Sequence, residues 1–129
     1  MLLLNSNLNN VAAVQPFVEQ AVQNININQD TYGNILVSLT EAVNNAIRHG
    51  NCCEEGKQVE IDIERELNDL TLRVSDEGHG FDFNNLPDPL APENIEKTGG
   101  RGLFLMRALS DDINFSNNGS TIEMKFKIS

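Results

Sequence analysis

The stretch TYGNILVSLTEAVNNAIR, residues 31–48, carries the clearest periodic pattern in the sequence. Its apolar side chains recur with the period of an α-helix, and Leu36, Leu39, Val43 and Ile47 form one stripe. Such a stripe is the face by which a helix packs on a sheet. The stretch therefore predicts a long amphipathic helix whose polar side is available to contact a ligand.

The flanking residues suggest where this helix and the one before it begin and end. Asp30 is a plausible N-cap, and Gly50 with Asn51 predicts the helix end. Residues 9–23 also have helical spacing, but Pro16 lies inside the pattern. Because proline disrupts a helix interior, we expect either a kink or a helix that begins late.

The remaining periodic segments alternate as strands do. Residues 59–66 and 70–74 predict a hairpin around Asn68-Asp69, and residues 113–115 and 121–128 predict a second around Asn118-Gly119. Residues 2–4 resemble a short first strand, and Leu103, Met106 and Leu109 have helical spacing. We expect a single domain over residues 1–129: a two-layer α+β sandwich with helices on one face of a mixed, mostly antiparallel sheet.

Charge and cysteine content narrow the classes of function. The chain has 129 residues, 9 basic and 19 acidic side chains and a net charge of -10, which disfavours direct nucleic-acid or membrane binding. Nucleotide binding remains compatible with this negative charge, because local cations, backbone amides and a metal ion can hold phosphates. Cys52 and Cys53 are adjacent, so a bridge between them would be strained. Free thiols and the absence of a basic leader predict a cytoplasmic protein.

The first candidate site is EAVNNAIRHG, residues 41–50. Glu41, Asn45 and His49 follow one another at intervals of four residues, along a side of the helix distinct from the apolar stripe. An asparagine oxygen suits Mg²⁺, and a nearby carboxylate can deprotonate an attacking hydroxyl. The alternative is an ordinary solvated helix face.

The second candidate site is VSDEGHGFD, residues 74–82. Asp76 ends an apolar strand, and Gly78 and Gly80 follow it. A carboxylate only accepts hydrogen bonds, so it can select an exocyclic amino group such as that of adenine, while glycines let the backbone approach a flat ligand. The alternative is a strand-ending turn rich in aspartate and glycine.

The third candidate site is TGGRGLFLM, residues 98–106. Glycines just before a helix form an anion-binding nest, and Lys97 and Arg101 add positive charge. The stretch is neither GxxxxGK[ST] nor GxGxxG. Residues 81–98 before it are polar and proline-rich, which predicts a long loop. The alternative is a flexible loop at a helix start.

The three segments in this order resemble the GHKL (Bergerat) ATPase superfamily, and within it the anti-sigma factor serine kinases of the RsbW type. The resemblance implies that Glu41 is the general base, Asn45 the Mg²⁺ ligand and Asp76 the acceptor for the adenine amino group of ATP. It also implies a lid at about residues 83–98. The other implied nucleotide-binding positions are Arg48, His49, Gly78, Gly80, Thr98, Gly99, Gly100, Arg101, Gly102 and Leu103.

The same resemblance implies a partner-switching role in transcription regulation. It describes an ATP- and Mg²⁺-dependent serine/threonine-protein kinase that acts as an anti-sigma factor, phosphorylates a STAS-type antagonist, binds a sigma factor and forms a homodimer. Two alternatives are a non-catalytic ATP-sensing module and a histidine-kinase-type domain acting in trans. Histidine kinases typically have asparagine at the position of Glu41, which favours the serine-kinase branch.

Overall fold

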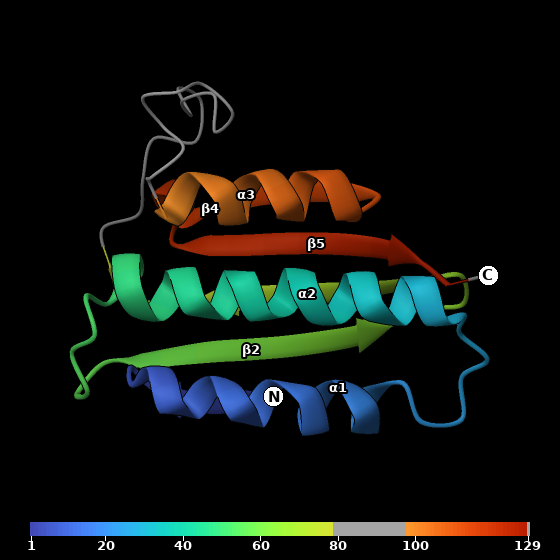
Figure 1. The fold of residues 1–129 in the computed structure, drawn as a ribbon, viewed down its shortest axis with the longest axis horizontal. Coiled ribbons are helices and arrows are strands. Elements are labelled where there is room, and N and C mark those ends of the chain that lie inside the picture. Colours follow the sequence, from blue (N-terminus) through green and yellow to red (C-terminus); the bar gives the residue numbers. More distant parts are fainter. Residues whose placement is uncertain (79–97, 129) are drawn as a thin grey trace.

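Three helices lie in one layer over a five-stranded sheet in the computed structural model (Figure 1). The structure describes residues 1–78 and 98–128, with the backbone alone for residues 98–101. The elements in chain order are β1 (Leu2–Asn5), η1 (Leu8–Ala13), α1 (Val14–Ala21), α2 (Gln29–Asn45), η2 (Ala46–Gly50), β2 (Gln58–Arg65), β3 (Asp69–Ser75), α3 (Thr98–Leu109), β4 (Asp112–Ser116), η5 (Asn117–Gly119) and β5 (Thr121–Lys127).

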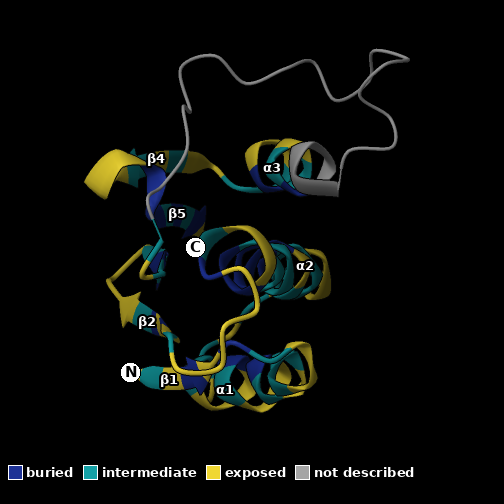
Figure 2. Cartoon of the chain, turned by 90° about the vertical axis from the view of Figure 1, so that its left-hand side faces the viewer, coloured by how far each residue is buried: buried dark blue, intermediate teal, exposed yellow. Residues whose placement is uncertain are grey.

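The sheet order is β1-β2-β3-β5-β4, and all four pairings are antiparallel. The register aligns Ile61, Val74 and Ile122 across the three central strands. Viewed end on, α1, α2 and α3 all cover the same face of the sheet (Figure 2). The predicted two-layer α+β sandwich and both predicted hairpins are confirmed. Over the described residues the sheet is wholly antiparallel rather than mixed, because each strand runs antiparallel to its neighbours. A single domain over residues 1–129 stays a prediction.

The two faces of the sheet differ as the period-2 pattern predicts. The inner face packs on all three helices in a core of buried apolar side chains: Leu4, Val14, Val18, Ile35, Leu39, Ala42, Val43, Ala46, Ile47, Val59, Ile61, Leu70, Leu72, Val74, Met106, Ile122, Met124 and Phe126. The outer face is polar, and there Arg73 donates two hydrogen bonds to Glu123, at 3.0 and 2.7 Å. Among the described residues, no helix is both long and apolar enough to cross a bilayer.

The first helix begins late, which is one of the two outcomes predicted from Pro16. A 3₁₀-helix, η1, precedes it and is capped by Asn7, whose side chain accepts from the Asn9 amide at 2.9 Å. Pro16 therefore lies in the first turn of α1. A proline is tolerated there because the first amides of a helix have no carbonyl partner within it.

The start of α2 corrects the expected N-cap. Asn28, not Asp30, precedes the helix in an extended conformation, and its side chain accepts from the Thr31 amide at 2.8 Å. Asp30 lies in the first turn instead, where its negative charge interacts favourably with the helix dipole.

The same helix ends where the sequence predicts, but through an unexpected type of turn. A π-helical turn, η2, extends α2 to Gly50 and is closed by the Asn51 amide on the Ala46 carbonyl at 2.8 Å. The left-handed residues that end the helix are Cys52 (φ 53°) and Cys53 (φ 58°), rather than Gly50. Turns of this kind recur at functional sites. The predicted helix end at Gly50 and Asn51 is confirmed, but Gly50 itself does not adopt the left-handed conformation usual for such a glycine.

The left-handed backbone at Cys52 gives a prediction for stability. A non-glycine residue in this region is strained by roughly 1–2 kcal/mol, and glycine is not. We expect Cys52→Gly to raise the free energy of unfolding by about 1 kcal/mol and the Tm by about 4 °C, measured by thermal denaturation. Cys52→Ala removes the same thiol but keeps the strain, so it should give no gain. Equal Tm values for the two variants would contradict this account.

Candidate functional site

The described part of the first and third candidate segments meets at Gly102. This residue is buried in α3, and a Cβ placed on it would lie 2.9 Å from both Glu41 Oε2 and Asn45 Nδ2. Glu41 and Asn45 are therefore side by side at the first turns of α3, on the side of α2 that faces that helix. Helix α3 can approach this closely because position 102 has no side chain.

The second segment meets the end of α2 in the same manner. Asp76 follows β3 directly, and its amide donates to the Ser120 carbonyl at 2.9 Å. A Cβ on Gly50 would collide with the Asp76 carboxylate, and one on Gly78 would collide with the Gly50 carbonyl. The helix end and the strand end are thus in direct backbone contact, with glycine on both sides.

The Asp76 carboxylate is half-buried in this contact. Burial raises its pKa above the ordinary value, while a 2.8 Å hydrogen bond from the Gly78 amide and the charge of Lys57 act in the opposite direction. The Gly78 amide donates to Oδ1, and no other described residue donates to the carboxylate. Oδ2 is consequently an acceptor that a ligand amino group can use.

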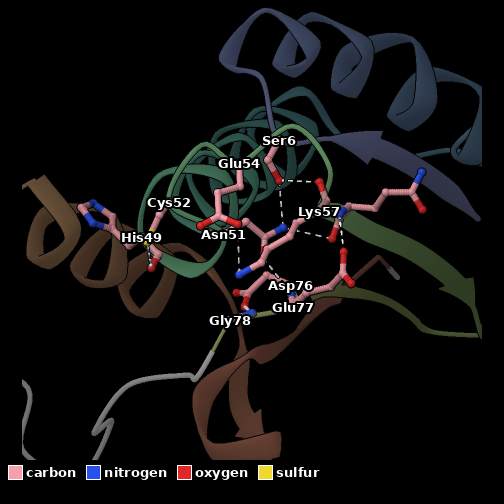
Figure 3. A network of polar contacts seen from close by, with 10 residues as sticks. Ser6, His49, Asn51, Cys52, Glu54, Lys57, Asp76, Glu77 and Gly78 are labelled. Atoms are coloured by element: carbon pink, nitrogen blue, oxygen red, sulfur yellow. Dashed lines mark hydrogen bonds and ion pairs between the residues drawn. The ribbon is translucent and has the colours of Figure 1, made fainter.

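A polar network beside Asp76 involves a residue that the sequence analysis missed as a site residue (Figure 3). The Asn51 side chain is fully buried and donates to Ser6 Oγ at 2.9 Å and to the Gln58 carbonyl at 3.0 Å. Its Oδ1 accepts from the Glu77 amide at 2.7 Å. Ser6 and Glu77 are 45 and 26 residues away in the sequence, so no local spacing signal could have revealed them as partners of Asn51.

The other predicted site residues lie in η2, in α3 or outside the described residues. Arg48 and His49 are exposed in η2, and Leu103 is partly buried in α3. Thr98, Gly99, Gly100 and Arg101 lie within the first turn of α3, which corrects the expectation of a glycine loop ahead of that helix. Gly80 and residues 83–97 of the expected lid lie outside the described residues.

The donors in this site suit Mg²⁺ better than a metal held by protein alone. The described residues contain no group of three or more histidine, cysteine, aspartate or glutamate side chains able to hold a metal. They do offer the Asn45 amide oxygen beside the Glu41 carboxylate. Magnesium usually takes one or two protein oxygens and completes its shell with water and substrate phosphates.

Comparison with known proteins agrees with this geometry. Two proteins named serine-protein kinase RsbW are 30% identical to the chain. The alignment with the protein of Oceanobacillus iheyensis spans 97 residues, which are 70% of this chain and 61% of the relative. The alignment with the protein of Bacillus subtilis spans 102 residues, which are 74% of this chain and 64% of the relative. The chain thus spans slightly less than two thirds of these curated relatives.

A solved structure and a family model extend the comparison over nearly the whole chain. The histidine kinase domain of the blue-light activated histidine kinase of Erythrobacter litoralis covers 94% of this chain and 58% of its own, at 18% identity and a TM-score of 0.55, which shows a shared fold. The model of the histidine kinase-like ATPase domain matches residues 4–126. The chain therefore belongs to the histidine kinase-like ATPase domain family.

Proposed function

We propose that this protein binds ATP and transfers its γ-phosphoryl group to a serine or threonine of a partner protein. The observation that carries the proposal is the contact of Gly102 with Glu41 and Asn45, because it joins a carboxylate and an amide oxygen to a helix N-terminus. A helix N-terminus attracts phosphate through its free amides and its dipole. A carboxylate beside bound phosphate can serve as a general base.

The adenine would be recognised at the other end of the site. Asp76 Oδ2 would accept a hydrogen bond from the exocyclic amino group, and the close backbone contact of Gly50 with Gly78 leaves the region without bulky side chains. Guanine has a carbonyl oxygen at the corresponding position, which a carboxylate does not bind. The site is therefore proposed to select adenine nucleotides.

Phosphoryl transfer needs mainly positioning and charge neutralisation. The residue proposed to hold Mg²⁺ is Asn45, and the ion when bound would neutralise charge on the phosphates. Glu41 would accept the proton from the attacking hydroxyl. The first turn of α3, residues 98–102, would contact the phosphates through its backbone amides. Residues 83–97 stay a proposed lid, and Arg48, His49 and Gly80 stay proposed nucleotide contacts.

The proposed partners come from the resemblance to the anti-sigma factor kinases, and the name of the relatives, serine-protein kinase RsbW, supports the kinase activity. We propose that this protein is cytoplasmic and acts as an anti-sigma factor kinase in partner switching. It would phosphorylate a STAS-type antagonist and, once freed from it, bind a sigma factor, as a homodimer. The proposed activity belongs to one domain over residues 1–129, and the RsbW relatives support it at 30% identity.

Asp76→Asn tests the adenine contact and gives a pH dependence. Asparagine presents an amide where Oδ2 accepts, so ATP affinity should fall roughly ten- to a hundredfold, measured by calorimetry. Without ligand the variant should be more stable than wild type at neutral pH, because burial raises the pKa of Asp76 in the folded state. Wild-type stability should fall as pH rises from the unfolded-state pKa through the folded one.

At pH values below the ordinary 3.8 of Asp76 the stability difference should vanish, since the carboxyl is then protonated in both states. Asp62→Asn is the matched control: it makes the same chemical change on the outer face of the sheet, in a 3.8 Å ion pair with the N-terminus. It should leave ATP affinity unaltered. Unchanged ATP binding by Asp76→Asn would refute the adenine contact.

Glu41→Gln tests the general base. The variant keeps the size of the side chain beside Gly102 but cannot accept the proton, so transfer should slow by about a hundredfold or more while ATP binding persists. The measurement is transfer of labelled γ-phosphate to a candidate STAS-type antagonist. Glu64→Gln, an exposed carboxylate on β2, is the control and should transfer at the wild-type rate.

The stability of the label distinguishes the alternatives. Acid-stable label on serine or threonine supports the kinase proposal, and acid-labile label on histidine indicates a histidine-kinase-type activity. ATP binding without transfer by the wild-type protein indicates a sensing module. A transfer rate for Glu41→Gln equal to that of the wild type would remove Glu41 as the base.

Gly102→Ala separates catalysis from folding. Alanine stabilises a helix by about 1 kcal/mol relative to glycine, but its Cβ would displace the ends of Glu41 and Asn45. We expect an unchanged or higher Tm with Mg²⁺-dependent transfer reduced roughly tenfold or more. Gly33→Ala, in α2 with open space around the new Cβ, should gain stability and keep full transfer. Full transfer by Gly102→Ala would contradict the proposed arrangement.

A further inference from the structure

We propose that Asn51 is a positioning residue, which holds the turn at residues 76–78 against Gly50 and thereby sets the preference for adenine over guanine. The inference rests on the proposed nucleotide-binding function and deepens it. Asn51 does not touch the proposed ligand site itself. It acts through Glu77, the residue between Asp76 and Gly78.

The hydrogen bonds of Asn51 form part of a closed ring. Its Oδ1 accepts from the Glu77 amide at 2.7 Å, and its Nδ2 donates to the Gln58 carbonyl at 3.0 Å. The Gln58 amide in turn donates to Glu77 Oε2 at 2.5 Å and closes the ring. The ring thus ties the end of η2 to the start of β2 and the end of β3.

This ring fixes the peptide that carries Asp76. The carbonyl side of that peptide belongs to Asp76 and its amide side to Glu77, so a bond on the Glu77 amide orients the plane between them. On the other side, Gly78 lies against the Gly50 carbonyl and donates to Asp76 Oδ1. The carboxylate is therefore held from both ends of a turn that has little rigidity of its own.

Asparagine is the residue type that these partners require. The site needs one acceptor and two donors in a fully buried position, and the carboxamide supplies all three. Aspartate lacks the donors, and glutamine has an additional methylene in a space already filled. Loss of the side chain leaves the Glu77 amide and the Gln58 carbonyl without these partners. Because buried unpaired polar groups destabilise a protein, we expect this loss to lower its stability.

The ring is separate from the proposed transfer groups. Glu41 and Asn45 lie on earlier turns of α2 and contact Gly102 in α3 instead. A defect at Asn51 should therefore weaken nucleotide binding and selection while leaving the chemical step intact. A merely structural role would lower stability without changing the ratio of ATP to GTP affinity.

The test compares Asn51→Ala with Ser6→Ala in the full chain. Ser6 bonds Asn51 on the side away from Glu77 and also donates to the Lys57 carbonyl at 2.8 Å, so its loss destabilises the same network without freeing the turn. For Asn51→Ala we expect ATP affinity to fall about tenfold or more, with a smaller loss for GTP. The KM for ATP should rise while kcat stays within about twofold. Ser6→Ala should lower Tm but keep the wild-type ratio of affinities.

Amide hydrogen exchange on the ligand-free protein tests the anchoring of the turn without any nucleotide. The Glu77 amide, although outside β3, should be protected about as well as the amides of that strand, and Asn51→Ala should remove this protection. Rapid exchange at Glu77 in the wild type would overturn the inference, as would an unchanged ratio of ATP to GTP affinity in folded Asn51→Ala. Failure of the wild type to bind ATP would instead refute the proposed function, and with it the link to adenine, while the exchange data would still decide whether Asn51 anchors the turn.

Discussion

The contact of Gly50 with Asp76 is the constraint on which the rest of the site depends. The Gly50 backbone lies against the Asp76 carboxylate, and Gly78 lies against the Gly50 carbonyl. Neither glycine has room for a Cβ, so this contact fixes the end of α2 against the end of β3. A helix is rigid over this distance, and fixing its last turn also fixes the direction of Asn45 and Glu41 on the preceding turns. The apolar stripe of α2, with Leu39, Val43 and Ile47 buried and Leu36 partly buried, keeps the helix from rotating.

The sequence predicted the parts of this arrangement that depend on local periodicity. The stripe from Leu36 to Ile47 and the alternation in β2 and β3 report which face of each element is buried, and burial is what drives their packing. Glu41, Asn45 and Asp76 were singled out by the order of their segments and by the family resemblance, since polar residues on a helix side or at a strand end are ordinary when taken alone. Asn51 was not, since its partners Ser6 and Glu77 are 45 and 26 residues away.

Glycine explains both the error at the start of α3 and the unexpected type of turn that ends α2. In a sequence, glycine beside a helix suggests a terminator or a loop, because it adopts left-handed backbone freely. Here Gly50 and Gly102 are inside helical turns, and each permits a neighbouring segment to approach. After α2, the residues with left-handed backbone are Cys52 and Cys53 instead. Whether a glycine supplies torsional freedom or space depends on contacts between distant segments, which local sequence does not encode.

The electrostatics of the site follow from the same packing. A half-buried carboxylate in a chain of net charge -10 is unfavourable, and the Gly78 amide and the distant charge of Lys57 offset it only in part. An adenine amino group would supply a further donor to that carboxylate, so nucleotide binding would stabilise its charged form. A group placed for binding rather than for folding is expected to behave in this way. Without the ring of hydrogen bonds around Asn51, the half-buried Asp76 carboxylate would be expected to turn toward water and away from the proposed adenine position. The ring opposes this tendency.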